Sequence, residues 1–327
     1  MNHHLFSQLI HLINSFHSIT VDQIQYKLDL DDDSATNLIS QLQQLGLPII
    51  TSDKDEIFLA KHIQPLAIEL IKTQLSENIT EELDFLPVFL TLDSTNQHFK
   101  NTKSELSELT RVCLAEHQAS GRGRRSKQWV SPLASNIYLS LHTRLKIPLK
   151  QIGGLSLVVG ISIIDGLKRL GIKGLEIKWP NDIYWEDKKL AGILIESTKI
   201  QENCVELIIG LGINVDMPES NAKEIDQAWV DLNNITGDQV CRNKVVASII
   251  DQLISNINKY QQCGLEAFMS QWQELDYLFQ KSIVVKSPDG TEKIGKAVGV
   301  NEQGELLMDL GGQIECIHAG DISVRKV

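Results

Sequence analysis

The spacing of apolar residues changes twice along this chain, and each change marks a different kind of fold. Leu5, Leu9, Leu12 and Phe16 recur at helical spacing near the N-terminus. From residue 86 onward, short apolar runs typical of strands alternate with helical segments. From residue 281 the helical spacing disappears, and alternation with turn residues predicts a small β-barrel. A chain of 327 residues is long enough for the three domains of an α+β, multidomain protein.

Residues 1–65 predict a small helical domain that ends in a hairpin. The expected elements are helices over 5–16, over 21–27 and from Ser34 to a stop at Gly46, then strands over 48–51 and 56–59. This order of three helices and a hairpin is that of a winged helix-turn-helix domain. Residues 66–85 follow as a connecting helix, 66–75, and a polar, acidic linker.

The charge of this first domain is unusual for a protein that reads DNA. Residues 1–65 hold three lysines, no arginine and eight acids, a net charge of −5. Asp31, Asp32 and Asp33 stand at the start of the third helix, which would be the recognition helix. Phosphate contacts usually supply most of the affinity for DNA, so this charge opposes binding. Ser34, Thr36 and Asn37 are the side chains of that helix that we expect to contact DNA if it binds.

Residues 86–280 predict a mixed α/β domain. Strands are expected over 88–92, 112–116, 136–141, 177–185, 191–196 and 205–215, with helices over 96–100, 151–170 and 245–260. The last part, 281–327, has turn signals at 301–304 and 311–312 and is expected to be the β-barrel.

One glycine-spaced basic run, Gly121-Arg122-Gly123-Arg124-Arg125-Ser126-Lys127, interrupts the central domain. The chain as a whole carries a net charge of −11, yet residues 117–164 contain no acid and seven lysines or arginines, four of them in this run. Glycine lets the backbone approach a ligand closely, and guanidinium groups bind phosphate or carboxylate oxygens in pairs. We predict a small-anion site here. A solvated loop and a nucleic-acid surface are the alternatives, and a pI of about 5.3 opposes the second.

Three other polar segments lie at the ends of predicted strands. They are Asp93–Asn96, Lys178–Asp182 with Lys188-Lys189 after it, and Gly210–Asn214. Two have a structural alternative, since 94–96 can cap a helix and Lys188-Lys189 can form an exposed hairpin tip. Pro180 predicts a strand end or bulge, a place that can direct side chains into a site. Gly192 allows close approach to its strand, and the glycines at 210 and 212 can pack against a base or another backbone. Together the segments supply cations, small hydrogen-bonding groups and one aspartate, without a catalytic triad, metal cluster or activated cysteine. This set suits attack of a substrate carboxylate on a nucleotide phosphate, with the protein orienting both.

Cysteine usage and hydropathy favour a cytoplasmic protein. The five cysteines are scattered and never form C-x-x-C, which fits a reducing compartment. The longest apolar run, 155–164, is too short and too polar to cross a bilayer, and the N-terminus does not resemble a signal peptide.

These motifs together resemble those of biotin protein ligases, specifically the kind that double as the biotin operon repressor. The resemblance lies in D-S-T-N at 93–96, E-H-Q-A-S-G-R-G-R-R at 116–125, K-W-P-N-D at 178–182, K-L-A-G-I-L at 189–194 and G-I-N at 212–214. It implies a winged helix-turn-helix domain over 1–65, a connecting segment over 66–85, a class II synthetase-like catalytic domain over 86–280 and an SH3-like domain over 281–327. The chain departs from the family at Ser126, where glycine is usual, and in lacking a basic recognition helix and a glycine-rich wing.

The resemblance implies a reaction in two steps. Biotin and ATP, with Mg²⁺, give biotinoyl-5′-AMP, and a lysine of the biotin carboxyl carrier protein of acetyl-CoA carboxylase then takes the biotin. It also implies a ligand-dependent homodimer and, as a second role, repression through operator DNA. A non-catalytic biotin-sensing regulator and a lipoate ligase of the same broad fold are the alternatives.

The resemblance also assigns roles to residues. The catalytic residues are Lys189, Arg122 and Asp182, and Asp182 is the expected Mg²⁺ ligand. The biotin-binding residues are Ser94, Thr95, Asn96, Gln118, Arg122, Gly123, Arg124, Lys189 and Gly192. The adenylate-binding residues are Arg124, Arg125, Trp129, Lys178, Asn181 and Asn214.

Overall fold

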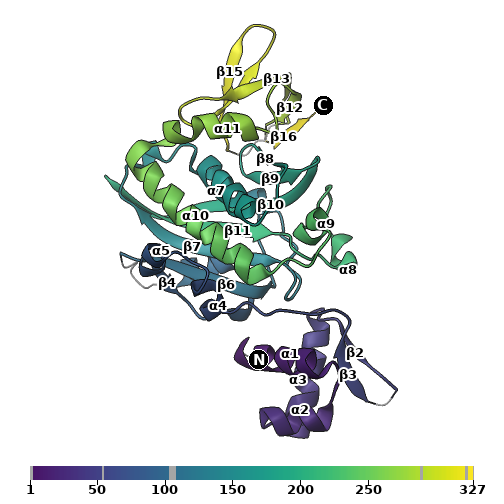
Figure 1. Ribbon diagram of the computed structural model, residues 1–327. Coiled ribbons are helices and arrows are strands. Elements are labelled where there is room, and N and C mark those ends of the chain that lie inside the picture. Colours follow the sequence, from purple (N-terminus) through teal and green to yellow (C-terminus); the bar gives the residue numbers. More distant parts are fainter. Residues whose placement is uncertain (1–2, 54, 103–107, 288–289, 321–322, 327) are drawn as a thin grey trace.

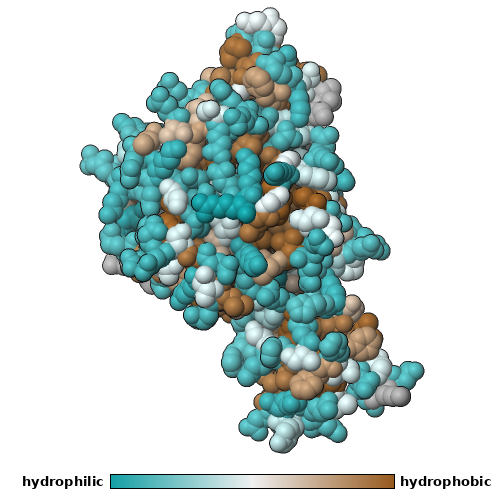
Figure 2. Space-filling model, viewed as in Figure 1, coloured by the Kyte–Doolittle hydropathy of each residue, from teal (hydrophilic) through white to brown (hydrophobic). Residues whose placement is uncertain are grey.

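The computed structural model describes residues 3–53, 55–102, 108–287, 290–320 and 323–326. A small helical part at the N-terminal end lies below a large central part, and a β-rich part lies above it in the view of Figure 1. The surface seen in Figure 2 is mostly polar, with an apolar area beside the segment that carries α8 (Glu219–Ala222) and α9 (Leu232–Thr236). No described helix is both long and apolar enough to cross a membrane.

The N-terminal part has the predicted winged helix-turn-helix order. Its elements are α1 (His3–Phe16), β1 (Ile19–Thr20), α2 (Val21–Leu28), α3 (Asp32–Gln44), β2 (Ile49–Thr51) and β3 (Glu56–Leu59). The strands form one antiparallel sheet in the order β1-β3-β2, and only the two-residue β1 was not predicted. Thr20 and Gln23 form a capping box, which fixes the start of α2.

The acidic run before α3 has a local structural role. The carboxylate of Asp31 accepts a hydrogen bond from the Ser34 amide, and the side chain of Ser34 together with this amide holds the pKa of Asp31 below its usual range. Asp32 and Asp33 lie in the first turn, where negative charge is favourable because of the helix dipole. These acids therefore stabilise the helix, whatever the helix binds.

The connecting segment differs from its prediction. The expected helix over 66–75 is the shorter α4 (Ile68–Lys72), and α5 (Glu77–Glu81) and β4 (Leu83–Phe85) were not predicted. Between the two helices, at the residue before α5, the buried carboxylate of Asp251 on the central domain accepts hydrogen bonds from both the amide and the hydroxyl of Ser76. A hydrogen bond to another domain cannot be predicted from the local spacing of apolar residues.

The central part is built on an eight-stranded mixed sheet. Besides β4 it contains β5 (Phe89–Leu92), β6 (Thr110–Gln118), β7 (Ile137–Leu145), β8 (Leu175–Lys178), β9 (Asp182–Trp185), β10 (Lys188–Gln201) and β11 (Cys204–Ile213). The order is β4-β6-β7-β11-β10-β9-β8, with β5 also pairing with β6. Among the named strands of the described residues, β4 and β5 pair with β6 in parallel and the other pairings of this sheet are antiparallel. The predicted strands are present, but 177–185 is a β8–β9 hairpin, because Pro180 lacks the amide that a continuous strand needs.

Helices cover both faces of this sheet. On one face α7 (Leu155–Arg169) packs against α10 (Arg242–Cys263), and a Cβ at Gly166 would lie only 2.9 Å from Ile249 Cα. The opposite face is covered by α6 (Thr95–Asn101), whose Phe99 packs with Cys113 of β6. Val112 and Leu114, on either side of Cys113, belong to the large core, as alternating strand residues should.

The C-terminal part is a five-stranded antiparallel sheet. Its strands β12 (Ser282–Lys286), β13 (Glu292–Val300), β14 (Leu306–Asp309), β15 (Ile314–Ile317) and β16 (Ser323–Lys326) pair in the order β15-β14-β13-β12-β16. Two short elements, η3 (Leu265–Phe268) and α11 (Met269–Leu275), precede it. The Trp179 indole donates to the Gly304 carbonyl at 2.9 Å, joining this sheet to the β8–β9 turn. The domain boundaries after residues 65, 85 and 280 stay predictions, because one apolar cluster includes both Leu66 and Val324.

The N-terminal part is attached to the central part by a buried charged contact. Glu116, at the end of β6, accepts hydrogen bonds from the Leu66 amide at 2.6 Å and from Arg242 at 2.7 Å. His3 of α1 lies 3.4 Å from the same carboxylate. Burial raises the pKa of Glu116, but the charge of Arg242 and these hydrogen bonds outweigh it and hold the pKa below its usual range.

A second buried carboxylate, Asp276, predicts a pH-dependent stability. Burial raises its pKa to about 6, although the Leu278 amide donates to it at 2.9 Å. Below the unfolded pKa of about 3.9 the group is neutral in both states. As pH rises through about 6 the folded state must carry an ionised, buried group and loses stability. In urea denaturation, we expect Asp276→Asn to gain up to about 3 kcal/mol relative to wild type between pH 4 and pH 7.5. A difference that is constant with pH would contradict this assignment.

Candidate functional site

A cavity of about 510 Å³ opens where the four polar motifs meet. It is lined by all the residues to which the sequence assigned biotin, adenylate or catalytic roles, which are Ser94, Thr95, Asn96, Gln118, Arg122, Gly123, Arg124, Arg125, Trp129, Lys178, Asn181, Asp182, Lys189, Gly192 and Asn214. Segments more than 100 residues apart in the sequence therefore share one cavity. The chemical roles of these residues stay predictions.

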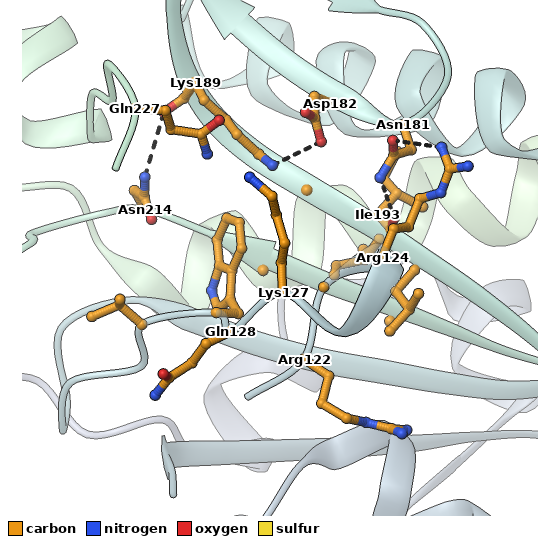
Figure 3. Close-up of a pocket in the computed structure, with 18 of the residues that line it drawn as sticks. Arg122, Arg124, Lys127, Gln128, Asn181, Asp182, Lys189, Ile193, Asn214 and Gln227 are labelled. Carbon is orange, nitrogen blue, oxygen red and sulfur yellow. Dashed lines mark hydrogen bonds and ion pairs between the residues drawn. The ribbon is translucent and has the colours of Figure 1, made fainter. Parts of the chain in front are cut away.

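An ion pair lies at the centre of the cavity. The ammonium of Lys189 is 2.9 Å from a carboxylate oxygen of Asp182 and 5.3 Å from the centre of the Trp129 ring (Figure 3). The Lys189 side chain is 15% exposed, whereas Lys188 is exposed. The alternative interpretation from the sequence, an exposed hairpin tip, therefore holds for Lys188 but not for Lys189.

The backbone of Lys189 is fixed on both sides. Its amide donates to the Ala228 carbonyl and its carbonyl accepts from the Val230 amide, each at 3.0 Å. On the other side, the β9–β10 register shifts between Lys189 and Ala191. Such a bulge redirects side chains, and here it turns the Lys189 side chain toward the cavity.

Two paired glycines form the floor under Trp129. Gly192 of β10 lies opposite Gly212 of β11, and a Cβ at Gly212 would lie 2.4 Å from Trp129 Cε2. A Cβ at Gly192 would lie 3.1 Å from the same ring. The indole therefore rests directly on the backbone of the sheet, which is the close approach that the glycine pattern suggested.

The basic run forms a tight loop that is closed on itself. The Gly123 amide donates to the Lys127 carbonyl at 2.7 Å, and the Trp129 amide donates to the Gly121 carbonyl at 2.9 Å. A short 3₁₀ turn, η1 (Arg124–Ser126), lies between them. Ser126 has φ of 55°, a left-handed conformation that glycine adopts without strain. Ser126, which the resemblance singled out as a departure from the usual glycine, is thus at a position where the backbone favours glycine.

Two arginines of this loop, Arg122 and Arg124, do not converge on Lys189. Arg122 points away from the Lys189–Asp182 pair in Figure 3, and its guanidinium is 3.3 Å from Glu196. Arg124 donates to Asn181 Oδ1 at 3.1 Å and also to the backbone carbonyls of Ala319 and Gly320 in the C-terminal part. Lys127 is the cation of this loop whose amine points toward Lys189 in Figure 3.

At the other end of the cavity, small polar side chains are buried. Ser94 begins α6, but its side chain makes no capping hydrogen bond, so capping does not explain it. Gln118 Oε1 accepts from the Thr95 amide at 2.9 Å, and Gln118 Nε2 donates to Ser131 at 3.2 Å. Ser94, Thr95 and Asn96 are each less than 5% exposed. This end of the cavity offers donors and acceptors without a net charge of their own.

Three further predicted residues hold the walls of the cavity. Asn181 donates to the Ile193 carbonyl at 2.8 Å, and Asn214 donates to the Val230 carbonyl at 3.1 Å. Lys178 lies 4.8 Å from the ring centre of Tyr184 and donates to its hydroxyl at 3.1 Å.

One wall was missed from the sequence. It consists of Met217, Glu224, Ile225, Asp226, Gln227 and Trp229, and it also includes Lys127 and Gln128 of the basic run. Asp226 lies 3.8 Å from Lys127, so the acidic segment meets the basic loop across the cavity. Lys127 was within the run that the sequence singled out, but residues 217–229 have no periodic pattern that points to a site.

The described residues contain no ready-made metal site. No group of three or more His, Cys, Asp or Glu in them could hold a metal ion. Within the cavity, Asp182 is the carboxylate beside Lys189. Mg²⁺ commonly binds one or two carboxylates together with substrate phosphates, and this arrangement would fit that mode.

The residues assigned to DNA lie far from this cavity, on α3. Ser34, Thr36 and Asn37 are exposed, and Asn37 accepts a hydrogen bond from Gln41 at 2.9 Å. Lys27, the lysine of the neighbouring helix α2, lies 4.6 Å from the ring centre of Phe16.

Comparison with known proteins agrees with this geometry. Residues 88–214 match the model of the Biotin/lipoate A/B protein ligase family, and residues 281–325 match that of the Biotin protein ligase C terminal domain. The chain is 34% identical over 311 residues to the Bifunctional ligase/repressor BirA of Salmonella typhimurium, covering 95% of this chain and 94% of that protein, with the same values for the protein of Escherichia coli.

A solved structure shares the fold. The biotin protein ligase from Aquifex aeolicus in complex with biotin and ATP has a TM-score of 0.64 and 27% identity, and covers 76% of this chain and 100% of that one. The fold, the set of motifs and the sequence identity to these ligases over nearly the whole chain lead to one conclusion. This chain belongs to the biotin protein ligase family and is a ligase of that family.

Proposed function

We propose that this protein activates biotin with ATP to form biotinoyl-5′-AMP and then transfers biotin to a lysine of the biotin carboxyl carrier protein of acetyl-CoA carboxylase. The observation that carries the proposal is a half-buried lysine, Lys189, between a polar pocket and an aromatic ring. Relatives named Biotin--[acetyl-CoA-carboxylase] ligase, such as that of Mycobacterium tuberculosis at 28% identity over 64% of this chain, support the choice of carrier.

The first step requires two anions to meet. The biotin carboxylate attacks the α-phosphate of ATP, an acyl–phosphate bond forms, and pyrophosphate leaves with the electron pair of the broken bond. Lys189 lies where it can offset the repulsion between these groups, and Asp182 and the bulge of β10 hold it there. Each well-placed donor of this kind is worth about 3–4 kcal/mol in the transition state. The second step transfers the acyl group to an amine and releases AMP, with no covalent enzyme intermediate.

Mg²⁺ would enter this site with ATP. When bound, it neutralises phosphate charge and so helps pyrophosphate to leave. Asp182 is the side chain that we assign to it, because a single carboxylate near the phosphates suffices when the phosphates supply the other oxygens. Asp182 would then serve both the cation and Lys189.

The polar end of the cavity favours biotin over lipoate. Ser94, Thr95, Asn96 and Gln118 are hydrogen-bonding groups, and three of them are almost fully buried. The ureido ring of biotin has donors and acceptors for such groups, whereas a dithiolane ring has none and would leave them unpaired. Competition between biotin and lipoate in adenylate formation distinguishes the two, and preference for lipoate would overturn the assignment.

The basic loop and the acidic segment that faces it are suited to shield the adenylate. Lys127 and Asp226 lie 3.8 Å apart, which brings the two segments together over the cavity. A mixed anhydride is hydrolysed by water, so a cover over the site protects it until the carrier lysine arrives. We place the reaction in the cytoplasm, where the five free cysteines of the chain would stay reduced.

Two further features stay predictions. We expect a ligand-dependent homodimer, which sedimentation with and without biotin and ATP measures. We also expect the domains to divide near residues 65, 85 and 280.

Replacing Lys189 should stop the first step. We expect Lys189→Ala to lower the rate of pyrophosphate release from biotin and ATP by about two to three orders of magnitude, because the charge is lost where the anions meet. Arg122→Ala, from the family assignment, should have an effect of the same order. Lys188→Ala is the matched control, since it removes an exposed neighbouring lysine and should leave the rate unchanged.

The test extends to the full reaction. Wild-type protein with biotin, Mg-ATP and a carrier domain should add one biotin by intact mass. Unaltered pyrophosphate release in Lys189→Ala and Arg122→Ala would show that the assigned roles are wrong. Tight biotin binding without any turnover of the wild-type protein would favour the non-catalytic regulator.

The floor of the cavity gives a separate prediction for the nucleotide. A methyl group at residue 212 would overlap Trp129, so Gly212→Ala should displace the indole and raise the KM for ATP about three- to tenfold through lost stacking. A shift in tryptophan fluorescence should accompany it. Trp129→Ala should show the same loss, and the two changes should not add. Independent, additive effects would contradict a role for Gly212 through Trp129.

Repression is the second candidate function. The winged-helix fold and relatives named ligase/repressors favour it, whereas the acids of α3 oppose it. With few cations to neutralise phosphates, we expect no mobility shift of operator-like DNA at about 1 µM protein and physiological salt, with or without biotin and ATP. A shift at that concentration that Asn37→Ala abolishes would instead establish α3 as the reading helix.

A further inference from the structure

One acid, Glu196, stands behind the biotin end of this basic cavity. It lies on β10, seven residues after Lys189, and its side chain is 20% exposed. Neither the motifs of the sequence nor the lining of the cavity includes it. A carboxylate near a site for two anions raises their electrostatic energy, so its position requires an explanation.

The first partner of Glu196 is the amide of Asn96. Asn96 Nδ2 donates to Glu196 Oε2 at 2.8 Å and to the Leu194 carbonyl at 3.3 Å. Asn96 Oδ1 accepts from the Ser140 hydroxyl at 2.6 Å and sits over Gly210, where a Cβ would lie 2.2 Å away. The carboxylate thereby sets which way the Asn96 amide faces, because an ionised carboxylate only accepts hydrogen bonds.

The other partners are two cations from different segments. Lys100 of α6 lies 2.5 Å from Glu196 Oε1, and Arg122 of the basic loop lies 3.3 Å from Glu196 Oε2. Burial raises the pKa of Glu196, but the hydrogen bonds from Lys100 and Asn96 and the charges of Lys100 and Arg122 outweigh burial and lower it. The group is therefore ionised at neutral pH.

These contacts join three segments that the cavity needs. Ser94, Thr95 and Asn96 come from the start of α6, Arg122 from the basic loop, and Gly192 from β10 itself. The carboxylate of Glu196 therefore connects α6 and the basic loop to strand β10. Lys100 balances one unit of negative charge, so the carboxylate adds little net repulsion to the cavity.

We propose that Glu196 is a positioning residue for the biotin end of the cavity, where it holds Asn96 and Arg122 against strand β10. It contacts none of the reacting atoms and acts through those two side chains. This inference rests on the proposed function, because it takes biotin as the ligand of that end.

The test uses Glu196→Gln, which keeps the shape of the side chain and removes the charge. We expect the Kd for biotin, measured by calorimetry, and the KM for biotin to rise about tenfold, the size of one charge-assisted hydrogen bond. The KM for ATP should stay within about twofold of wild type. If Glu196→Gln instead binds biotin more tightly, Glu196 weakens binding through charge repulsion, and the proposal is overturned.

Two comparisons show whether the effect passes through Arg122. Glu196→Gln added to Arg122→Ala should weaken biotin binding less than it does in the wild-type protein, because only the contact with Asn96 then remains to be lost. Lys100→Met leaves Glu196 in contact with Asn96 and Arg122 and should leave the biotin Kd within about twofold of wild type. Full additivity with Arg122→Ala, or a loss in Lys100→Met equal to that in Glu196→Gln, would overturn the proposal.

A matched control separates positioning from stability. Glu206 of β11 is also buried and lies 2.9 Å from Arg144, but this pair is not part of the cavity. Glu206→Gln should lower the melting temperature at least as much as Glu196→Gln does, without changing the biotin Kd. Because the Kd does not need turnover, a wild-type protein that binds biotin but forms no adenylate would refute the proposed function alone. Wild-type biotin affinity in Glu196→Gln would refute the positioning role alone.

Discussion

The register of strand β10 is the constraint on which the cavity depends. Residues of a strand alternate between the two faces of a sheet, yet Leu190 and Ala191 are consecutive and both belong to the large core. The bulge between Lys189 and Ala191 makes this possible, because it inserts one residue opposite β9. Lys189 therefore joins Gly192 and Glu196 on one face. A regular strand would direct the Lys189 side chain into the core.

The same register explains the neighbours of Lys189. Gly192 pairs with Asp182 on β9 and with Gly212 on β11, so one level of the sheet brings together the carboxylate, the lysine and the two glycines under Trp129. The backbone of Lys189 is hydrogen-bonded to residues 228 and 230 on its other side, and these bonds hold the bulge in place. The site is thus produced by pairing across three adjacent strands.

Much of the fold and the site could be predicted from sequence, for identifiable reasons. Helical spacing in the N-terminal part and the missing amide of Pro180 are local signals, and both led to the observed structure. The glycines at 192 and 212 indicated close approach, which Trp129 makes. In contrast, the direction of Arg122, the wall formed by residues 217–229 and the contact of Ser76 with Asp251 depend on partners distant in the chain. No local pattern records such partners.

The acids of the N-terminal part have opposite effects on its fold and on the binding of DNA. The acids before α3 cap that helix and favour its dipole, so they stabilise the winged-helix fold while opposing DNA. The core of this part also includes Leu90, Leu133 and Ala134 of the central part. Leu90 lies on β5, which leads to Ser94, and Glu116 lies two residues before Gln118. Helix α1 is therefore attached at the base of the polar end of the cavity, and this attachment gives the part a structural reason to be retained even without a DNA ligand.

The cationic side chains of the cavity are already paired with protein groups that a bound anion would have to replace. Lys189 is paired with Asp182, Lys127 with Asp226 and Arg122 with Glu196, and Arg124 donates to two backbone carbonyls. An anion that binds here must compete with these protein groups, so its affinity reflects only the difference between the old and the new contacts. This keeps four cations close together in an acidic protein without the repulsion that unpaired charges would bring. If the proposed roles hold, the carboxylates beside the cations, and not the cations alone, would determine how tightly an anion is held.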